Sequence, residues 1–264
     1  MRNKNIFKLI LFVSIFALTG LSCGVSGIGN LFATETPTPT STYTPTPTFT
    51  PSPTSTSTPT STPTATPMPG AILEEIPGGF TRFTDFEGGY SFILPDGWFV
   101  LNFVVDDPEA VLNDAMQANP DKALILNGFQ TAIAQNARMG AADFAPDHST
   151  SMSAPFLFSV LDDKTQFMPL DDVLDVNAQM LPQLLNADVT TSDVMENPQG
   201  VSYGVLDITI SLTAQGTTTS VIEKLILFKT NDYTVFVTFA VLEELEEKGL
   251  EGVDVLIDSL ELVP

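Results

Sequence analysis

Cysteine and histidine are nearly absent from this chain. Cys23 is the only cysteine among 264 residues, and His148 is the only histidine. A single cysteine excludes a disulfide within the chain, even in the oxidising compartment outside a cell. A single histidine excludes a metal site built on two of them. A hydrolase triad would have to use His148, because it is the only histidine. This residue lies in the polar loop 147–151, and we expect it to have no catalytic role.

Basic residues are scarce as well. From Ala71 onward seven Lys and Arg stand against 31 Asp and Glu, a net charge of −24. Such a surface repels nucleic-acid phosphates and anionic lipid headgroups, so the sequence predicts no nucleic-acid partner. It favours solubility, the accumulation of cations or a basic partner.

Motifs of catalysis and cofactor binding are missing too. The sequence has no Gly-x-Ser-x-Gly elbow, no phosphate loop and no dinucleotide loop. The densest acidic groups, Asp162-Asp163 and Asp171-Asp172 with Asp175, lack the spacing of a calcium loop. We interpret them as a strand end and the first turn of a helix. The sequence therefore predicts no catalytic residues, no cofactor and no metal, and a protein that is not an enzyme.

The N-terminus has the pattern of an export signal. Arg2, Lys4 and Lys8 precede an apolar run at residues 9–18, and small residues follow up to Cys23. The position of Cys23 resembles the lipidation site of bacterial lipoproteins, although Gly20 stands where that family usually has Leu. The resemblance implies a signal peptide at 1–22 and a lipid-anchored mature N-terminus at 23–35. The alternatives are an uncleaved membrane helix over about 6–25 and cleavage that releases the protein.

The segment that follows is a low-complexity linker, assigned to residues 36–70. Its first 34 positions hold 15 Thr, 10 Pro and 5 Ser, with no charge. Pro removes backbone donors, and Thr and Ser offer too little apolar surface to offset the entropy of ordering. We expect a disordered stalk, which at roughly 3.1 Å per residue would extend about 100 Å. Its hydroxyl groups are also potential acceptors of O-linked sugars.

Residues 71–264 remain for one folded domain. Aromatic and branched residues at 90–94 and 98–103, separated by Pro95-Asp96-Gly97, predict a β-hairpin. Asp107 and Pro108 mark a helix start, and the Ala-rich segment to Gly140 is expected to be helical with a break at Asn119-Pro120.

The second half of the domain has stronger patterns. We expect a strand at 154–161 and a helix at 170–185 with Pro182 near its end. Alternation at 206–212, a turn at Gly216, a strand at 221–228 and another at 233–240 predict an antiparallel meander. An amphipathic helix closes the chain at 242–260, with four Glu on its outer face and Gly249 and Gly252 as expected weak points.

These elements resemble the PsbP-like family. The likeness lies in the segment Gly89-Tyr90-Ser91-Phe92-Ile93-Leu94-Pro95-Asp96-Gly97-Trp98, the late meander and the closing Ile257-Asp258-Ser259-Leu260. It covers roughly residues 79–103 and 170–262, with 106–140 as a helical insertion. The resemblance implies an α/β/α sandwich on an antiparallel sheet, and a role in assembly or interaction.

The sequence thus predicts a lipid-anchored, surface-displayed exported protein whose acidic domain has a non-catalytic binding or assembly role. Its partners are the membrane, through the anchor on Cys23, and an extracytoplasmic protein. The alternative is a receptor domain for a small ligand or a cation, and a hydrolase is a third hypothesis. Trp98 and its aromatic neighbours are expected in the core.

Overall fold

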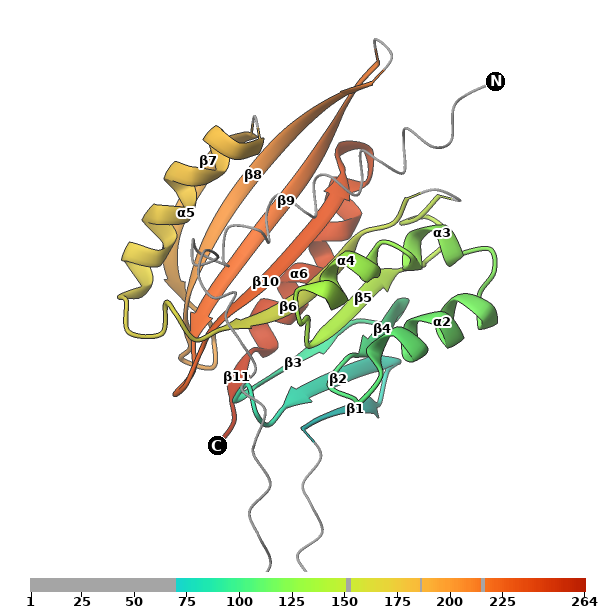
Figure 1. Cartoon of the computed structure of the whole chain (residues 1–264), viewed down its shortest axis with the longest axis horizontal. Coiled ribbons are helices and arrows are strands. Elements are labelled where there is room, and N and C mark those ends of the chain that lie inside the picture. The colour runs from blue at the N-terminus through green and yellow to red at the C-terminus, as the bar shows by residue number, and fades with distance from the viewer. Residues whose placement is uncertain (1–69, 151–152, 186, 215–216) are drawn as a thin grey trace, which may run out of the picture. The chain divides into compact units, whose positions relative to one another are not determined.

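The computed structural model describes residues 70–150, 153–185, 187–214 and 217–264 (Figure 1). The signal peptide, Cys23, the linker and the turn at Gly216 lie outside the described residues, and these assignments stay predictions. Within the described residues, no helix is long and apolar enough to cross a membrane.

The larger of two sheets has seven strands, all paired antiparallel, in the order β4-β5-β6-β10-β9-β8-β7. Its strands are β4 (Trp98–Asn102), β5 (Met139–Asp143), β6 (Phe156–Asp162), β7 (Ala187–Glu196), β8 (Ser202–Ala214), β9 (Thr217–Lys229) and β10 (Thr234–Leu242). Strands β8, β9 and β10 form the predicted meander. The strand predicted at 154–161 is β6.

The smaller sheet has the order β1-β2-β3-β11 and corrects the predicted hairpin. Its strands are β1 (Ala71–Ile76), β2 (Phe80–Asp85), β3 (Tyr90–Leu94) and β11 (Glu261–Leu262). Strand β3 pairs with β2 and β11, whereas β4 pairs with β5, so the turn between them carries the chain from one sheet to the other. Strand β3 is mostly buried and β4 is buried at Trp98 and Leu101, and burial in two separate layers has the same local pattern as burial in one hairpin.

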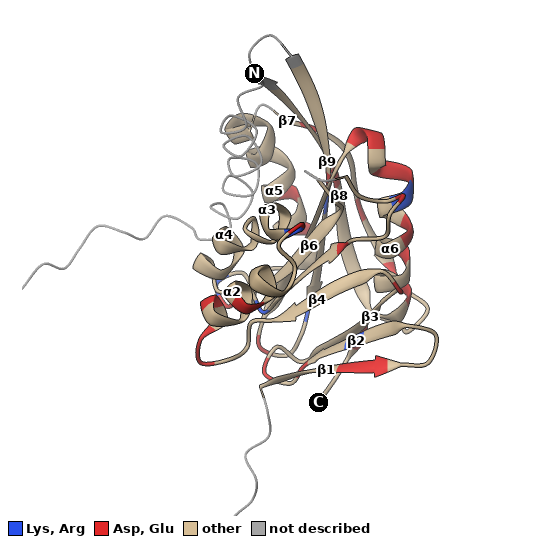
Figure 2. Ribbon diagram, turned by 90° about the vertical axis from the view of Figure 1, so that its right-hand side faces the viewer, with Lys and Arg blue, Asp and Glu red and all other residues tan. Residues whose placement is uncertain are grey.

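Helices lie on both faces of the large sheet (Figure 2). They are α2 (Pro108–Ala118), α3 (Ala123–Leu126), α4 (Phe129–Ala134), α5 (Leu170–Leu185) and α6 (Glu246–Ser259), with a 3₁₀ turn η1 (Glu243–Leu245) before α6. Helices α2 to α5 share one apolar core with residues such as Leu206 and Ile208. Helix α6 and the small sheet share the other core, with Tyr203 and Val205. This layering confirms the predicted α/β/α sandwich on an antiparallel sheet.

The segment 106–140 is mostly helical, as predicted, and begins where the sequence indicates. The Asp107 side chain accepts a hydrogen bond from the Ala110 N–H at 2.9 Å, and Pro108 is the first helical residue. Asn119 ends α2. The helical prediction is wrong over its last six residues, because α4 ends at Ala134 and Met139 and Gly140 belong to β5, which the sequence did not indicate.

The two glycines of α6 are contact positions and not weak points. A Cβ atom added to Gly252 would lie 2.6 Å from Cζ2 of Trp98, and one added to Gly249 would lie 3.0 Å from Cζ of Phe239. Both glycines are buried, so their missing side chains allow α6 to approach the sheet closely. Trp98 itself is 7% exposed, which confirms its predicted place in the core.

Candidate binding site

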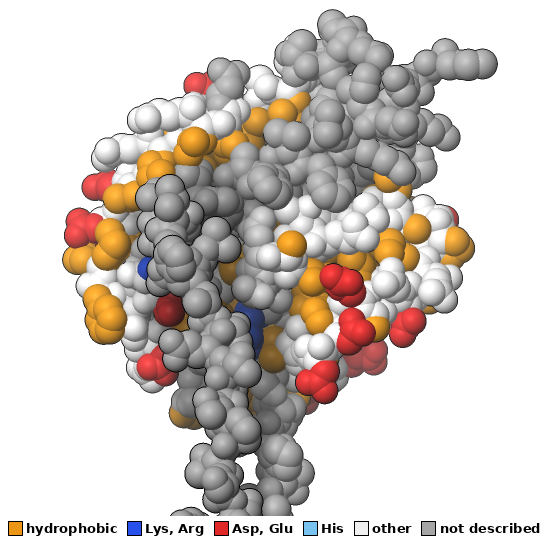
Figure 3. Space-filling view, viewed as in Figure 1, with side chains coloured by type: hydrophobic (Ala, Val, Ile, Leu, Met, Phe, Trp, Pro, Cys, Tyr) orange, Lys and Arg blue, Asp and Glu red, His pale blue; other side chains and the backbone are white. Residues whose placement is uncertain are grey.

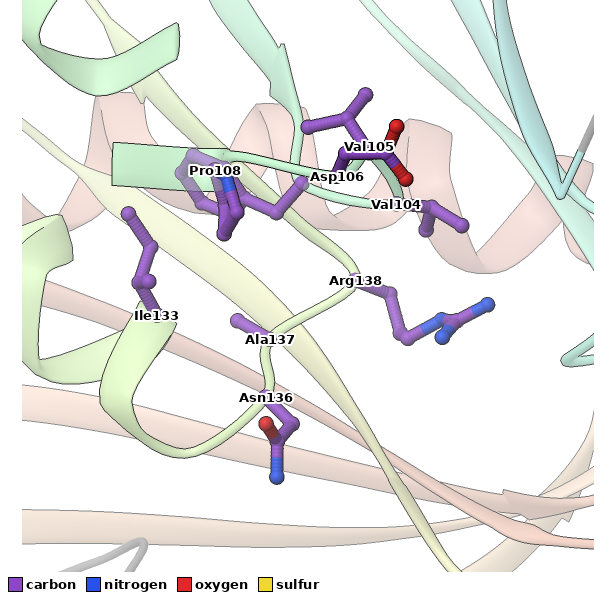
Figure 4. Close-up of a pocket in the computed structure, with 9 residues that line it drawn as sticks. Val104, Val105, Asp106, Pro108, Ile133, Asn136, Ala137 and Arg138 are labelled. Carbon is purple, nitrogen blue, oxygen red and sulfur yellow. The ribbon is translucent and has the colours of Figure 1, made fainter. Parts of the chain in front are cut away.

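A pocket of about 400 Å³ lies between two connections, the one from β4 to α2 and the one from α4 to β5 (Figure 4). The first connection supplies residues 103–106 and Pro108, and the second supplies Ile133 and residues 136–138. Six of these nine side chains are apolar, and Asp106, Asn136 and Arg138 are the polar ones. Polar and apolar atoms contribute comparable parts of the exposed lining, so the pocket can contact both the apolar and the polar parts of a ligand.

One backbone hydrogen bond joins the two walls of the pocket, and further hydrogen bonds hold each wall in place. The Phe103 N–H donates to the Arg138 carbonyl at 3.0 Å, and the Arg138 N–H donates to the Ser159 carbonyl at 2.8 Å. Asn136, with φ at 59°, turns the chain out of α4, a conformation that Asn tolerates better than most residues. The Asn102 side chain accepts from the Val104 N–H at 2.9 Å.

Arg138 joins the pocket wall to a buried acid. Its Nε and Nη2 atoms lie 2.7 and 3.0 Å from the two carboxylate oxygens of Asp85, which is fully buried, and Nη2 also lies 2.7 Å from Glu87. Burial alone lowers the pKa of Arg138, but the hydrogen bonds and charges of Asp85 and Glu87 outweigh it and raise that pKa. The guanidinium is therefore a fixed, compensated charge.

A second buried contact lies behind this pair. The Tyr90 hydroxyl and the Ser159 hydroxyl are 2.8 Å apart, and Tyr90 is fully buried. Burial, followed by the nearby charge of Asp85, raises the pKa of Tyr90, so its hydroxyl stays protonated. Tyr90 comes from the small sheet and Ser159 from the large one, so this contact also links the two sheets.

His148 forms a pair with a buried carboxylate that sequence reasoning missed. Its Nδ1 atom lies 2.6 Å from Oδ2 of Asp143, and its Nε2 atom lies 3.7 Å from Asp147. The hydroxyl of the adjacent Ser149 donates to the Ala145 carbonyl at 3.0 Å. In the part of the chain that the structure describes, no hydroxyl is hydrogen-bonded to His148 Nε2. The only signal of this pair in the sequence was that Asp143 precedes His148 by five residues.

Glu223 is a buried carboxyl on β9 that sequence reasoning also missed. Both of its side-chain oxygens lack a hydrogen-bond partner, and the residue is 1% exposed. It faces the same core as Val221 and Leu225, opposite Ile208 and Ala240. Burial raises the pKa of Glu223 well above its usual value. The signal in the sequence was one acidic residue at a position where the alternation along the strand otherwise places apolar residues that face the core.

The predicted roles of the acidic pairs are confirmed. Asp162 ends β6 and accepts hydrogen bonds from Lys164 and Thr165, and Asp171 and Asp172 lie in the first turn of α5. Among the described residues, no group of three or more His, Cys, Asp or Glu side chains is placed to hold a metal ion.

No protein-family model and no curated protein matches this sequence. Several solved structures are similar to the chain. The solution structure of PsbP from the cyanobacterium Synechocystis sp. PCC 6803 is 13% identical with a TM-score of 0.39, covering 70% of this chain and 93% of that one.

Two further solved structures have comparable scores. LpqN from Mycobacterium tuberculosis, described as involved in cell envelope biogenesis, is 13% identical with a TM-score of 0.41, covering 74% of this chain and 91% of that one. The Ran-binding protein Mog1p from Saccharomyces cerevisiae is 10% identical with a TM-score of 0.41, covering 69% and 94%. At these identities the likeness concerns the fold alone.

Proposed function

We propose that this chain is a lipid-anchored protein of the cell envelope whose domain binds a partner without catalysing a reaction. The anchor is Cys23, at the end of the export signal, and the Thr/Pro-rich linker displays the domain at a distance from the membrane. Tethering raises the concentration of the domain near other envelope components.

The observation that carries the binding role is the pocket between residues 103–108 and 133–138. Six of its nine lining residues are apolar, polar atoms contribute slightly more than half of its exposed lining, and its rim residue Val105 is 46% exposed. Exposed apolar side chains around a concave surface are typical of contact sites.

The tether is tested by intact mass and membrane partition after expression in a bacterial host. We expect a diacylated mature protein that begins at Cys23 and fractionates with membranes, and a soluble Cys23→Ala variant. An unmodified full-length protein that stays in the membrane in both forms would contradict the anchor and indicate a spanning N-terminal helix instead.

The binding role is tested by affinity capture from envelope extracts with two variants of similar exposure. Val105→Arg blocks the rim of the pocket, and Val194→Arg changes a 43% exposed valine on the edge strand β7. We expect one protein to be recovered by the wild type and by Val194→Arg but not by Val105→Arg. Equal recovery by all three forms would remove the pocket from the binding function.

A further inference from the structure

The charges around the pocket disfavour an anionic ligand. Arg138 is the cation of the lining, but its guanidinium already contacts the carboxylates of Asp85 and Glu87. Asp106 adds a third carboxylate and has no ion pair within the described residues. The lining therefore contains one guanidinium that is already paired with two carboxylates and one carboxylate without an ion pair, so a positively charged group gains more from this site than a negative one.

The surface around the pocket is also negatively charged. Acidic side chains lie together over α2 and the loop before it (Figure 3). Asp107, Glu109 and Asp114 are exposed in this region. A cation approaching the pocket is therefore attracted before it makes contact.

The apolar residues of the lining favour a cation that is attached to an aliphatic chain. Val105, Pro108, Ile133 and Ala137 offer aliphatic contact, while the carboxylate of Asp106 lies exposed near the rim. A flexible aliphatic stem gains from contact with such walls, and a terminal ammonium keeps its charge near water at the rim. Lysine combines these two parts in one side chain.

The exposure of the rim favours a side chain presented by a protein over a free amine. Pockets for small ligands usually enclose most of the ligand surface, whereas this pocket is open at its rim, where Val105 is 46% exposed and Asp106 is exposed. The volume of about 400 Å³ also exceeds the space that one lysine stem occupies, which leaves room for its neighbours in the chain.

We infer that this pocket binds a lysine side chain of an extended segment of a basic partner protein, with its stem against Val105, Pro108 and Ile133 and its ammonium on Asp106. The inference rests on the proposed binding function and adds the chemistry of the partner.

The test uses the full chain in detergent and a fluorescent, capped heptapeptide with a central lysine between serine and glycine residues. Binding is followed by fluorescence anisotropy at low ionic strength. We expect saturable binding that the norleucine version of the peptide lacks. The Asp106→Asn variant should weaken binding of the lysine peptide by more than twofold and up to about fivefold, the upper part of the range for one exposed ion pair. The control Asp114→Asn removes an exposed acid of α2 outside the pocket lining and should leave the affinity within twofold.

Three results would overturn the inference. These are equal binding of the norleucine peptide, equal weakening by Asp106→Asn and Asp114→Asn, and competition by free 1,5-diaminopentane at the same concentration as the peptide. The last result would indicate a free amine as the ligand. Absence of peptide binding combined with partner capture that still depends on Val105 would reject the lysine and keep the binding function.

Discussion

The guanidinium of Arg138 and the fully buried carboxylate of Asp85 are joined by two hydrogen bonds, across 53 residues of sequence. Asp85 ends β2 in the small sheet, and Arg138 directly precedes β5 in the large one. This pair therefore fixes the position of one sheet against the other, and it also fixes one wall of the pocket.

Replacing Asp85 with Asn should lower the free energy of unfolding by about 3–5 kcal/mol, because it leaves the guanidinium without its buried partner. Urea denaturation measures the change. Glu87→Gln is the matched control, since the Glu87 side chain is 56% exposed and its loss should cost less than about 1 kcal/mol. Equal effects of the two variants would mean that the buried ion pair contributes no more to the free energy of unfolding than the exposed one.

The buried Glu223 should make stability depend on pH. Because burial raises its folded pKa above the ordinary 4.5, the unfolded chain ionises first as pH rises. The contribution of Glu223 to the free energy of unfolding is therefore fully present below a pH of about 4.5, and it is lost as the pH rises toward the pKa of the folded state.

Glu223→Leu should remove this loss and stabilise the protein by about 1–3 kcal/mol near neutral pH, the usual cost of an unpaired buried polar group. Urea denaturation of both forms at pH 5 and pH 8 measures the effect. The gain should be larger at pH 8. A gain that is the same at both pH values would show that Glu223 does not titrate differently in the two states.

Gly252→Ala should destabilise the protein, although alanine favours helices. The new methyl group would lie 2.6 Å from the Trp98 ring, and overpacking of this kind costs about 1–3 kcal/mol. Gly249→Ala meets its neighbours at 3.0 Å and should cost less. Thermal denaturation of the two variants ranks them, and stabilisation by Gly252→Ala would show that α6 moves freely away from the sheet.

His148→Ala should lower stability without affecting partner capture. It removes the contact at 2.6 Å to Asp143 and leaves that buried carboxylate with the Ala145 N–H, a loss of about 1–2 kcal/mol. Denaturation and affinity capture are measured on the same preparation. Loss of capture in a folded variant would assign His148 to the binding site.

The sequence predicted those helices and strands that are determined by residues close to one another in the chain. The acid at Asp107 before Pro108 marked the start of α2, and alternation along β8 marked the meander. Strand β7 escaped prediction because it is an edge strand with mostly exposed Asp, Thr and Ser, and β5 because its Gly and Ala side chains have no clear period.

Long-range pairings were beyond the sequence. No local pattern connects Arg138 with Asp85, and the pocket exists only because residues 103–108 and 133–138 meet in space. The turn at 95–97 was recognised, but the sheet to which β4 belongs is decided by its partner β5, some 40 residues later.

Strand β11 gives the last residues of the chain a role in the order of folding. Glu261 pairs with Ser91, and Asn197 donates to the carbonyls of Ile257 and Leu260 at 2.8 and 2.7 Å. The small sheet thus begins near the first described residue and is closed by residues near the last. The small sheet therefore cannot be complete before residues 261 and 262 have been synthesised and have paired with β3. Until they pair, the backbone groups along that edge of β3 are open to pairing with another strand.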